Sequence, residues 1–103
     1  MLTDQERAKL INKIRILPEQ LEALVAPLDD RQLHTHFLPH EWTVAQNIHH
    51  LADSHMNSFI RMKLTLTEEY PTLKPYDQDV WAQTADYDLP ISTSLSMLHG
   101  LHA

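Results

Sequence analysis

Apolar residues recur at helical spacing in three stretches of the chain. In the first stretch they are separated by four and three residues in alternation: Leu10, Ile14, Leu17, Leu21, Leu24 and Leu28. This stripe predicts an amphipathic helix, and Thr3 with Glu6 forms the capping pattern that begins one. Pro18 falls inside the stripe without shifting its phase. We therefore expect one long helix kinked at Pro18, or two abutting segments, ending near Pro27.

The clearest helical pattern covers residues 43 to 69. Thr43 and Gln46 form a second capping pattern, and the positions of one face follow three or four residues apart: Val44, Ile48, Leu51, His55, Phe59, Met62 and Leu66. Pro71 and Pro75 end this pattern. The preceding residues 31 to 42 show no helical period, so we expect them to form a connecting loop.

Residues 70 to 90 hold three prolines, all three tyrosines and Trp81. We expect an ordered aromatic loop in which "DQDVWAQT" forms one or two helical turns, and such loops are typical of functional or interfacial segments. A third helix is predicted from about Ile91, with Leu95, Leu98 and Leu101 on its apolar face. It reaches barely three turns before Ala103, as in a truncated product. Residues 1–103 are interpreted as a single all-α domain.

Composition excludes several classes of function. A chain of 103 residues suits one small domain, and its single glycine argues against an all-β fold and excludes glycine-rich phosphate loops. The formal net charge of −6 argues against a nucleic-acid partner. Without cysteine there is no disulfide or thiol nucleophile. No secretory signal or membrane-spanning run is visible, so we expect a cytoplasmic protein.

Three histidines of the second predicted helix occupy different faces. His55 falls on the apolar stripe and is expected to be a neutral core residue with one hydrogen bond, whereas His49 is expected to pack at a helix–helix edge. His50 lies opposite the apolar stripe, in a polar stripe completed by Gln46, Asp53 and Asn57. That stripe has short hydrogen-bonding side chains and no lysine or glutamate, which favours a functional role over the alternative, a solvated face.

A metal site usually needs three or more ligands. His50 with Asp53 or Ser54 supplies at most two from one helix. The loop histidines 34, 36 and 40 fix no ligand geometry, and the pair His99 and His102 lies at a helix end. His50 is the candidate metal ligand, and Gln46, Asp53 and Asn57 are candidate groups that orient it or contact a substrate.

The stretch "EWTVAQNIHHLADSHMNSFIRMKLTLTEEYPTLKPYDQDVWA" resembles the YfiT-like group of the DinB-like superfamily. The resemblance extends from about Thr3 to Ala103. Its specific parts are the block from "WTV" to "LTE" and the following "KPYDxDxWA". One departure is that the "GGWT" common in the family is replaced by "PHEWT", which alters the turn before the helix although Thr43 still caps it.

The resemblance implies a four-helix bundle, often dimeric, with zinc or nickel held by three histidines. It also implies a metal-dependent hydrolase acting on a small molecule, and relatives in the wider superfamily transfer thiols. The second histidine of the "HH" pair, here His50, matches the first ligand. The family's other two ligands form an H-x-x-x-H arrangement on a last helix that this sequence does not reach. His99 and His102 match an earlier region and do not inherit that role.

We therefore expect an incomplete bundle of about three helices that is metal-free or binds metal weakly, and that is inactive by itself. We also expect it to cover its exposed core face by forming a homodimer or a higher assembly. Two alternatives remain open. The chain could be a helical self-association module without catalysis, or a pH sensor that uses His49, His50 and His55.

Overall fold

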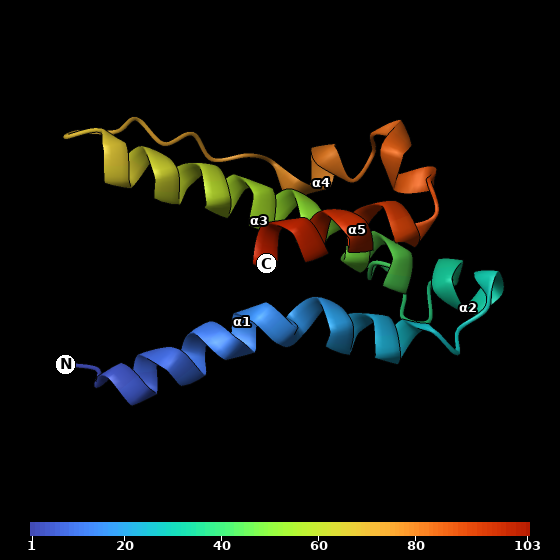
Figure 1. Ribbon diagram of the computed structural model, residues 1–103. Helices are drawn as coiled ribbons and strands as arrows, with labels where there is room; N and C mark the ends of the chain where they lie inside the picture. The colour runs from blue at the N-terminus through green and yellow to red at the C-terminus, as the bar shows by residue number, and fades with distance from the viewer.

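The computed structural model describes residues 1–103, and all of its regular elements are helices. Its elements are α1 (Asp4–Val25), α2 (Asp30–His34), α3 (Val44–Thr67), α4 (Gln78–Trp81), the short 3-10 helix η1 (Ala85–Asp88) and α5 (Ile91–His102). The long helices α1 and α3 run in opposite directions, and α5 lies against both of them over half their length (Figure 1). The predicted all-α class with three main helices is confirmed.

The boundaries of α1 and α3 follow their capping residues. Thr3 accepts a hydrogen bond from the Glu6 backbone N–H, and Thr43 makes the reciprocal exchange with Gln46 that defines a capping box. The first helix continues through Pro18, which is buried. The prediction of one long first helix is therefore correct, and it ends at Val25.

The prediction of a loop over residues 31–42 is wrong at its start, because α2 occupies Asp30–His34. Asp29 and Gln32 form a capping box there, and Leu33 is buried. A five-residue helix is too short to show an apolar period, and isolated helices of this length are not stable. Docking of Leu33 against α3 stabilises it instead. The short η1 was missed for the same reason, whereas α4 and α5 lie where helices were predicted.

The core lies at one end of the molecule, where α5 fills the space between α1 and α3. Its apolar members are Val25, Leu33, Ala45, Ile48 and Leu95, and Leu98 of α5 is completely buried. We call this the closed end. At the other end, the open end, residues 4–14 of α1 and 59–67 of α3 diverge with no helix between them (Figure 1).

The open end leaves part of the predicted apolar faces uncovered. Phe59 is 38% exposed, Met62 60% and Leu66 85%, and Ile14 on α1 is 58% exposed. The radius of gyration is 15.9 Å, larger than the about 13 Å typical of a compact domain of this length. The predicted stripe on residues 43–69 is therefore buried only in its first half.

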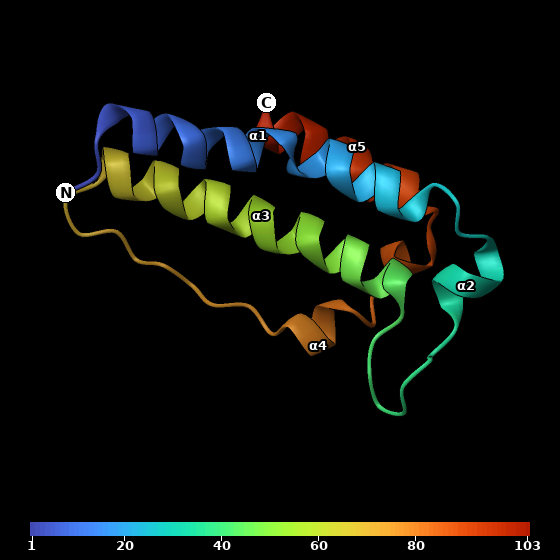
Figure 2. The same cartoon turned by 90° about the horizontal axis from the view of Figure 1, so that it is seen from below.

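The segment between α3 and α4 returns alongside α3 toward the closed end (Figure 2). The Arg61 guanidinium donates to the carbonyl oxygen of Lys74 at 3.0 Å and holds this segment on α3. None of the helices combines the length and apolar character needed to cross a membrane.

Candidate functional site

His50 is placed on the second turn of α3, close to the capping box that begins the helix. Its side chain is half-buried, and the imidazole lies edge-on to Trp42, with ring centroids 5.0 Å apart at 66°. The Nδ1 atom is shielded from solvent and has no hydrogen-bond partner. Buried polar atoms are nearly always paired. This nitrogen is the one exception among the buried side-chain polar atoms of the chain.

A polar cavity of about 390 Å³ lies beside His50. Its other lining residues come from the turn before α3, from α3 itself and from α4: His40, Glu41, Trp42, Asn47, Gln78 and Asp79. Two carboxylates line this cavity and no lysine or arginine does. We call it the His50 cavity. The α4 residues could not be assigned to it from the sequence, because only the return of the chain along α3 brings them near.

Asp53 lies one turn after His50 but points into the protein. It is 8% exposed and accepts a hydrogen bond of 2.7 Å from the Tyr87 hydroxyl. Burial raises the pKa of the Asp53 carboxyl, and the hydrogen bond from Tyr87 opposes this rise. Burial and the neighbouring carboxylate likewise raise the pKa of Tyr87. Asp53 therefore ties η1 to α3 and does not line the His50 cavity.

The other two members of the predicted polar stripe also lie apart from that cavity. Gln46 is occupied in the capping box with Thr43. Asn57 donates to the backbone oxygen of Asp53 at 2.8 Å and lines a separate cavity near Trp81. The four polar residues thus share one face of α3. They do not share one site, because different parts of the chain pack against each of them.

His49 lies where α3 packs against α5, in keeping with the predicted helix–helix contact, and it is buried at 3% exposure. Its Nε2–H donates to the Leu89 carbonyl oxygen at 2.9 Å, so in the neutral ring Nδ1 accepts from the Ser94 hydroxyl at 2.6 Å. The ring also packs on Tyr87, with centroids 5.3 Å apart. The sequence could not predict these two hydrogen bonds, because the partners lie 40 and 45 residues away in the chain.

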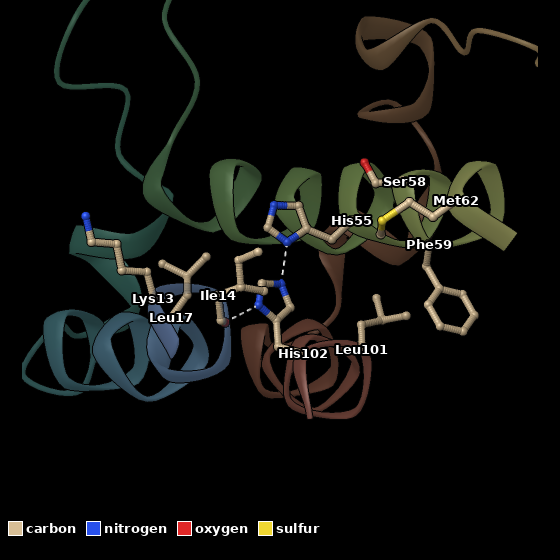
Figure 3. Close-up of a pocket in the computed structure, with 9 residues that line it drawn as sticks. All are labelled: Lys13, Ile14, Leu17, His55, Ser58, Phe59, Met62, Leu101 and His102. Carbon is tan, nitrogen blue, oxygen red and sulfur yellow. Dashed lines mark hydrogen bonds between the residues drawn. The ribbon is translucent and has the colours of Figure 1, made fainter. Parts of the chain in front are cut away.

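His55 is half-buried and not a core residue, contrary to the prediction, although the hydrogen bond expected of it is present. The His102 Nδ1–H donates to the Ile14 carbonyl oxygen at 2.5 Å, so its Nε2 accepts from His55 Nδ1–H, also at 2.5 Å. Figure 3 shows this chain of bonds at the mouth of an apolar cavity of about 340 Å³. Burial, with the neighbouring charges of His102 and His50, lowers the pKa of His55.

Three of the remaining histidines have partners of their own. His34 and His36 each direct Nδ1 at a backbone carbonyl oxygen, that of Asp30 and that of Glu41, both at 2.8 Å. His99 contacts the Glu22 carboxylate at 2.7 Å. No three histidine, aspartate or glutamate side chains converge on a point where they could hold a metal ion.

The fit of a metal to these residues therefore depends on His50. The His50 imidazole lines a cavity that also presents oxygen and nitrogen donors, and this combination of groups is suited to a divalent cation. His50 is the candidate ligand, and a complete metal site would need further groups, because no three such side chains of this chain converge.

Comparison with known proteins gives consistent matches. A model of the DinB superfamily matches residues 13–102. The chain is 53% identical over 92 residues to a "Putative metal-dependent hydrolase" of Oceanobacillus iheyensis, covering 89% of this chain and 54% of that protein. It is 46% identical over 101 residues to a protein of the same description from Bacillus mycoides, covering 98% and 58%.

A solved structure matches nearly the whole chain. YfiT from Bacillus subtilis, described as "a probable metal-dependent hydrolase with an unusual four-helix bundle topology", superposes with a TM-score of 0.91 at 42% sequence identity. The match covers 99% of this chain and 59% of YfiT. The chain thus spans somewhat more than half the length of these relatives.

Proposed function

This chain belongs to the DinB superfamily, as the resemblance predicted, and on that premise we propose that it functions in a metal-dependent hydrolase that acts on a small molecule. In this proposal His50 is a metal ligand, and the ligand set is completed by groups outside the 103 residues. The residues alone would then bind metal weakly and would not catalyse hydrolysis.

The observation that carries this proposal is the unpaired, buried Nδ1 of His50 next to a polar cavity. A buried histidine that serves only packing usually has a carbonyl or hydroxyl partner, as His49 does. Imidazole ligands suit zinc and nickel, and we propose one of these as the ion.

A bound divalent ion would supply a nucleophile by lowering the pKa of a bound water, and it would polarise the bond to be cleaved. The residues of this chain would orient the reactants. The Trp42 ring fixes the plane of the His50 imidazole. Glu41 and Asp79 can accept hydrogen bonds from the substrate, and Gln78 can donate one. The Asn47 amide nitrogen already donates to the Thr43 carbonyl oxygen at 2.9 Å, which leaves its side-chain oxygen to accept.

Titration of the chain with Zn²⁺ and Ni²⁺, followed by calorimetry and by imidazole NMR signals, tests the ligand. We expect His50→Ala to remove the tightest binding event, while His34→Ala, at an exposed histidine, leaves it unchanged. Equal affinity and stoichiometry in the His50 variant and the original chain would rule out His50 as a ligand.

The open end favours a second candidate, association with a second copy of this chain. Apolar side chains of α1 and α3 face one another there across the cavity of Figure 3, lined by Ile14, Leu17, Phe59, Met62 and Leu101. Exposed apolar surface of this extent usually marks an interface. Covering it with a second copy would add the core that the chain lacks.

Sedimentation velocity over micromolar concentrations tests the association. We expect a dimer that Met62→Asp converts to a monomer, because a charge at the centre of the apolar interface loses its hydration. Leu24→Asp is the matched control, since Leu24 is 71% exposed but lies at the closed end. A monomer at about 100 μM, a concentration at which even a weak association would be populated, would contradict the proposal.

A further inference from the structure

The segment that returns along α3 builds a second, smaller cavity on the same helix face as His50. This cavity, of about 270 Å³, is lined by Asn57, Lys74, Pro75, Tyr76, Asp77 and Trp81. Tyr76 and Trp81 form its aromatic wall, with ring centroids 4.6 Å apart at 48°. We call it the Trp81 cavity. Asn57 is the one candidate site residue among them, and the relatives' descriptions assign no role to this cavity.

The two cavities lie next to each other along α3. Asn57 follows His50 by seven residues, which is two helical turns and a rise of about 10 Å on one face of α3. The single turn of α4 separates them, because Gln78 and Asp79 line the His50 cavity whereas Asp77 and Trp81 line the other. An elongated molecule about 10 Å long could therefore reach both.

The free charge in the Trp81 cavity is positive. The Asp77 carboxylate is engaged in capping α4, where it accepts from the backbone N–H groups of Asp79 and Val80 at 3.0 and 3.2 Å. The Lys74 ammonium has no carboxylate partner within the chain. Asn57 uses its amide group on the Asp53 carbonyl, which leaves its side-chain oxygen free to accept a hydrogen bond.

The cavity is also held in place by contacts outside it. Arg61 fixes the backbone at Lys74 with a 3.0 Å hydrogen bond, and the Asp77 cap fixes the start of the turn that carries Trp81. A platform of two aromatic rings with an adjacent cation suits a planar ligand that bears a negative charge. The His50 cavity has the opposite character, with two carboxylates and no cation.

From this juxtaposition, we propose that the Trp81 cavity is a specificity subsite for the non-reacting end of the substrate. It would take a planar aromatic group carrying a carboxylate or a similar anion, while the polar, uncharged end of the same molecule lies at His50. The orientation of the other end of the substrate toward His50 rests on the proposed function. Binding of the anionic ring to the Trp81 cavity does not.

Tryptophan fluorescence offers a direct test, because the chain has only two tryptophans. The Trp42→Phe variant leaves Trp81 as the sole reporter. We expect 4-nitrobenzoate, a planar anion that quenches fluorescence, to give saturable quenching. Its neutral isostere 4-nitrobenzamide should bind at least about threefold more weakly, the scale of one exposed charge pair.

Two lysine variants then locate the anion. Lys74→Gln should abolish the preference for the carboxylate, whereas Lys13→Gln, at the lysine of the apolar cavity in Figure 3, should leave it unchanged. Tyr76→Leu should weaken both probes several-fold by removing half of the platform. Circular dichroism checks that each variant keeps its helix content.

Linear quenching that is equal for both probes, or a preference that survives in Lys74→Gln, would overturn the proposal. A preference lost in Lys13→Gln instead would place the ligand in the apolar cavity and would also overturn it. Adding His50→Ala separates this inference from the metal proposal. We expect that variant to keep the quenching, whatever its metal affinity.

Discussion

At the closed end of the molecule, α5 lies between α1 and α3, and the apolar stripe of each helix is covered. At the open end the same stripes continue along α1 and α3, but Ile14 and Leu66 are 58% and 85% exposed. The periodicity is equally good in both halves. It reports which face of a helix is apolar, and only the position of α5 decides whether that face is buried.

The polar groups show the same contrast within the closed end. His49 and Asp53 each have hydrogen-bond partners from the segment 87–94. His50 stands between them in the chain, and its buried Nδ1 has none. Buried polar groups that are paired stabilise a fold, whereas one left unpaired costs free energy.

The largest expected effect breaks the closed end. Leu98→Ala removes a completely buried side chain of α5 and should lower the free energy of unfolding by about 2–5 kcal/mol. Leu66→Ala at the open end should change it by less than about 0.5 kcal/mol. Urea unfolding monitored by circular dichroism measures both, and equal losses would contradict the division into two ends.

A smaller loss is expected when the link between η1 and α3 is cut. Tyr87→Phe removes the donor to Asp53 and leaves a buried carboxylate without its 2.7 Å partner, at a cost of about 1–3 kcal/mol. Asp53→Asn is the matched variant, because its amide oxygen can still accept from Tyr87 without burying a charge. If both variants lose equal stability at pH 7, burial of the Asp53 charge does not account for the loss in Tyr87→Phe.

The effect of pH sharpens the comparison further. The pKa of His55 lies below its ordinary value of 6.5 in the folded protein, so the unfolded chain binds more protons between the two values. Stability should therefore be full above about pH 6.5 and decrease as the pH falls through that window, by less than the Tyr87→Phe loss. Unfolding at pH 5 and 8 measures it, and His55→Gln should flatten this part of the profile.

Asp53 contributes with the opposite sign. Its pKa is raised above the ordinary 3.8, so the folded protein binds the proton more readily than the unfolded chain. The contribution of Asp53 is favourable at low pH and is lost as the pH rises through the folded pKa. Asp53→Asn removes this contribution, and the stability difference between the variant and the original chain should therefore shift toward the variant as the pH rises from 3 to 7.

The smallest expected effect concerns the turn before α3. His40 has a φ of 66°, in the left-handed region that is unfavourable for residues other than glycine. His40→Gly should raise the free energy of unfolding by up to about 1 kcal/mol, because relief of this strain exceeds the added entropy of the unfolded glycine. A clear loss of stability would show that the His40 side chain makes a compensating contact.

Several elements could be predicted because their causes lie within a few residues. The caps Thr3 and Thr43, the periodic apolar positions and the prolines after α3 locate the long helices to within two residues of the observed bounds. The short α2 and η1 could not be predicted, since burial of Leu33 and Tyr87 against distant residues stabilises them.

The candidate site divides in the same way. His50 could be selected from spacing along one helix, and the family resemblance selects the same residue. Its cavity could not be predicted, because Asp79 approaches only after the chain turns back along α3 (Figure 2). The assignment of His55 to the core is wrong because nothing covers α3 beyond it on that face.

Local sequence thus specifies where helices begin, which face of each is apolar and which histidine stands on a polar face, because these properties depend on residues within one or two turns. Tertiary structure alone decides which part of the apolar face is covered, which polar groups find partners and which α4 side chains reach His50. Those outcomes depend on contacts between residues far apart in the chain, such as His49 with Ser94 and Asp53 with Tyr87, and no local pattern records them.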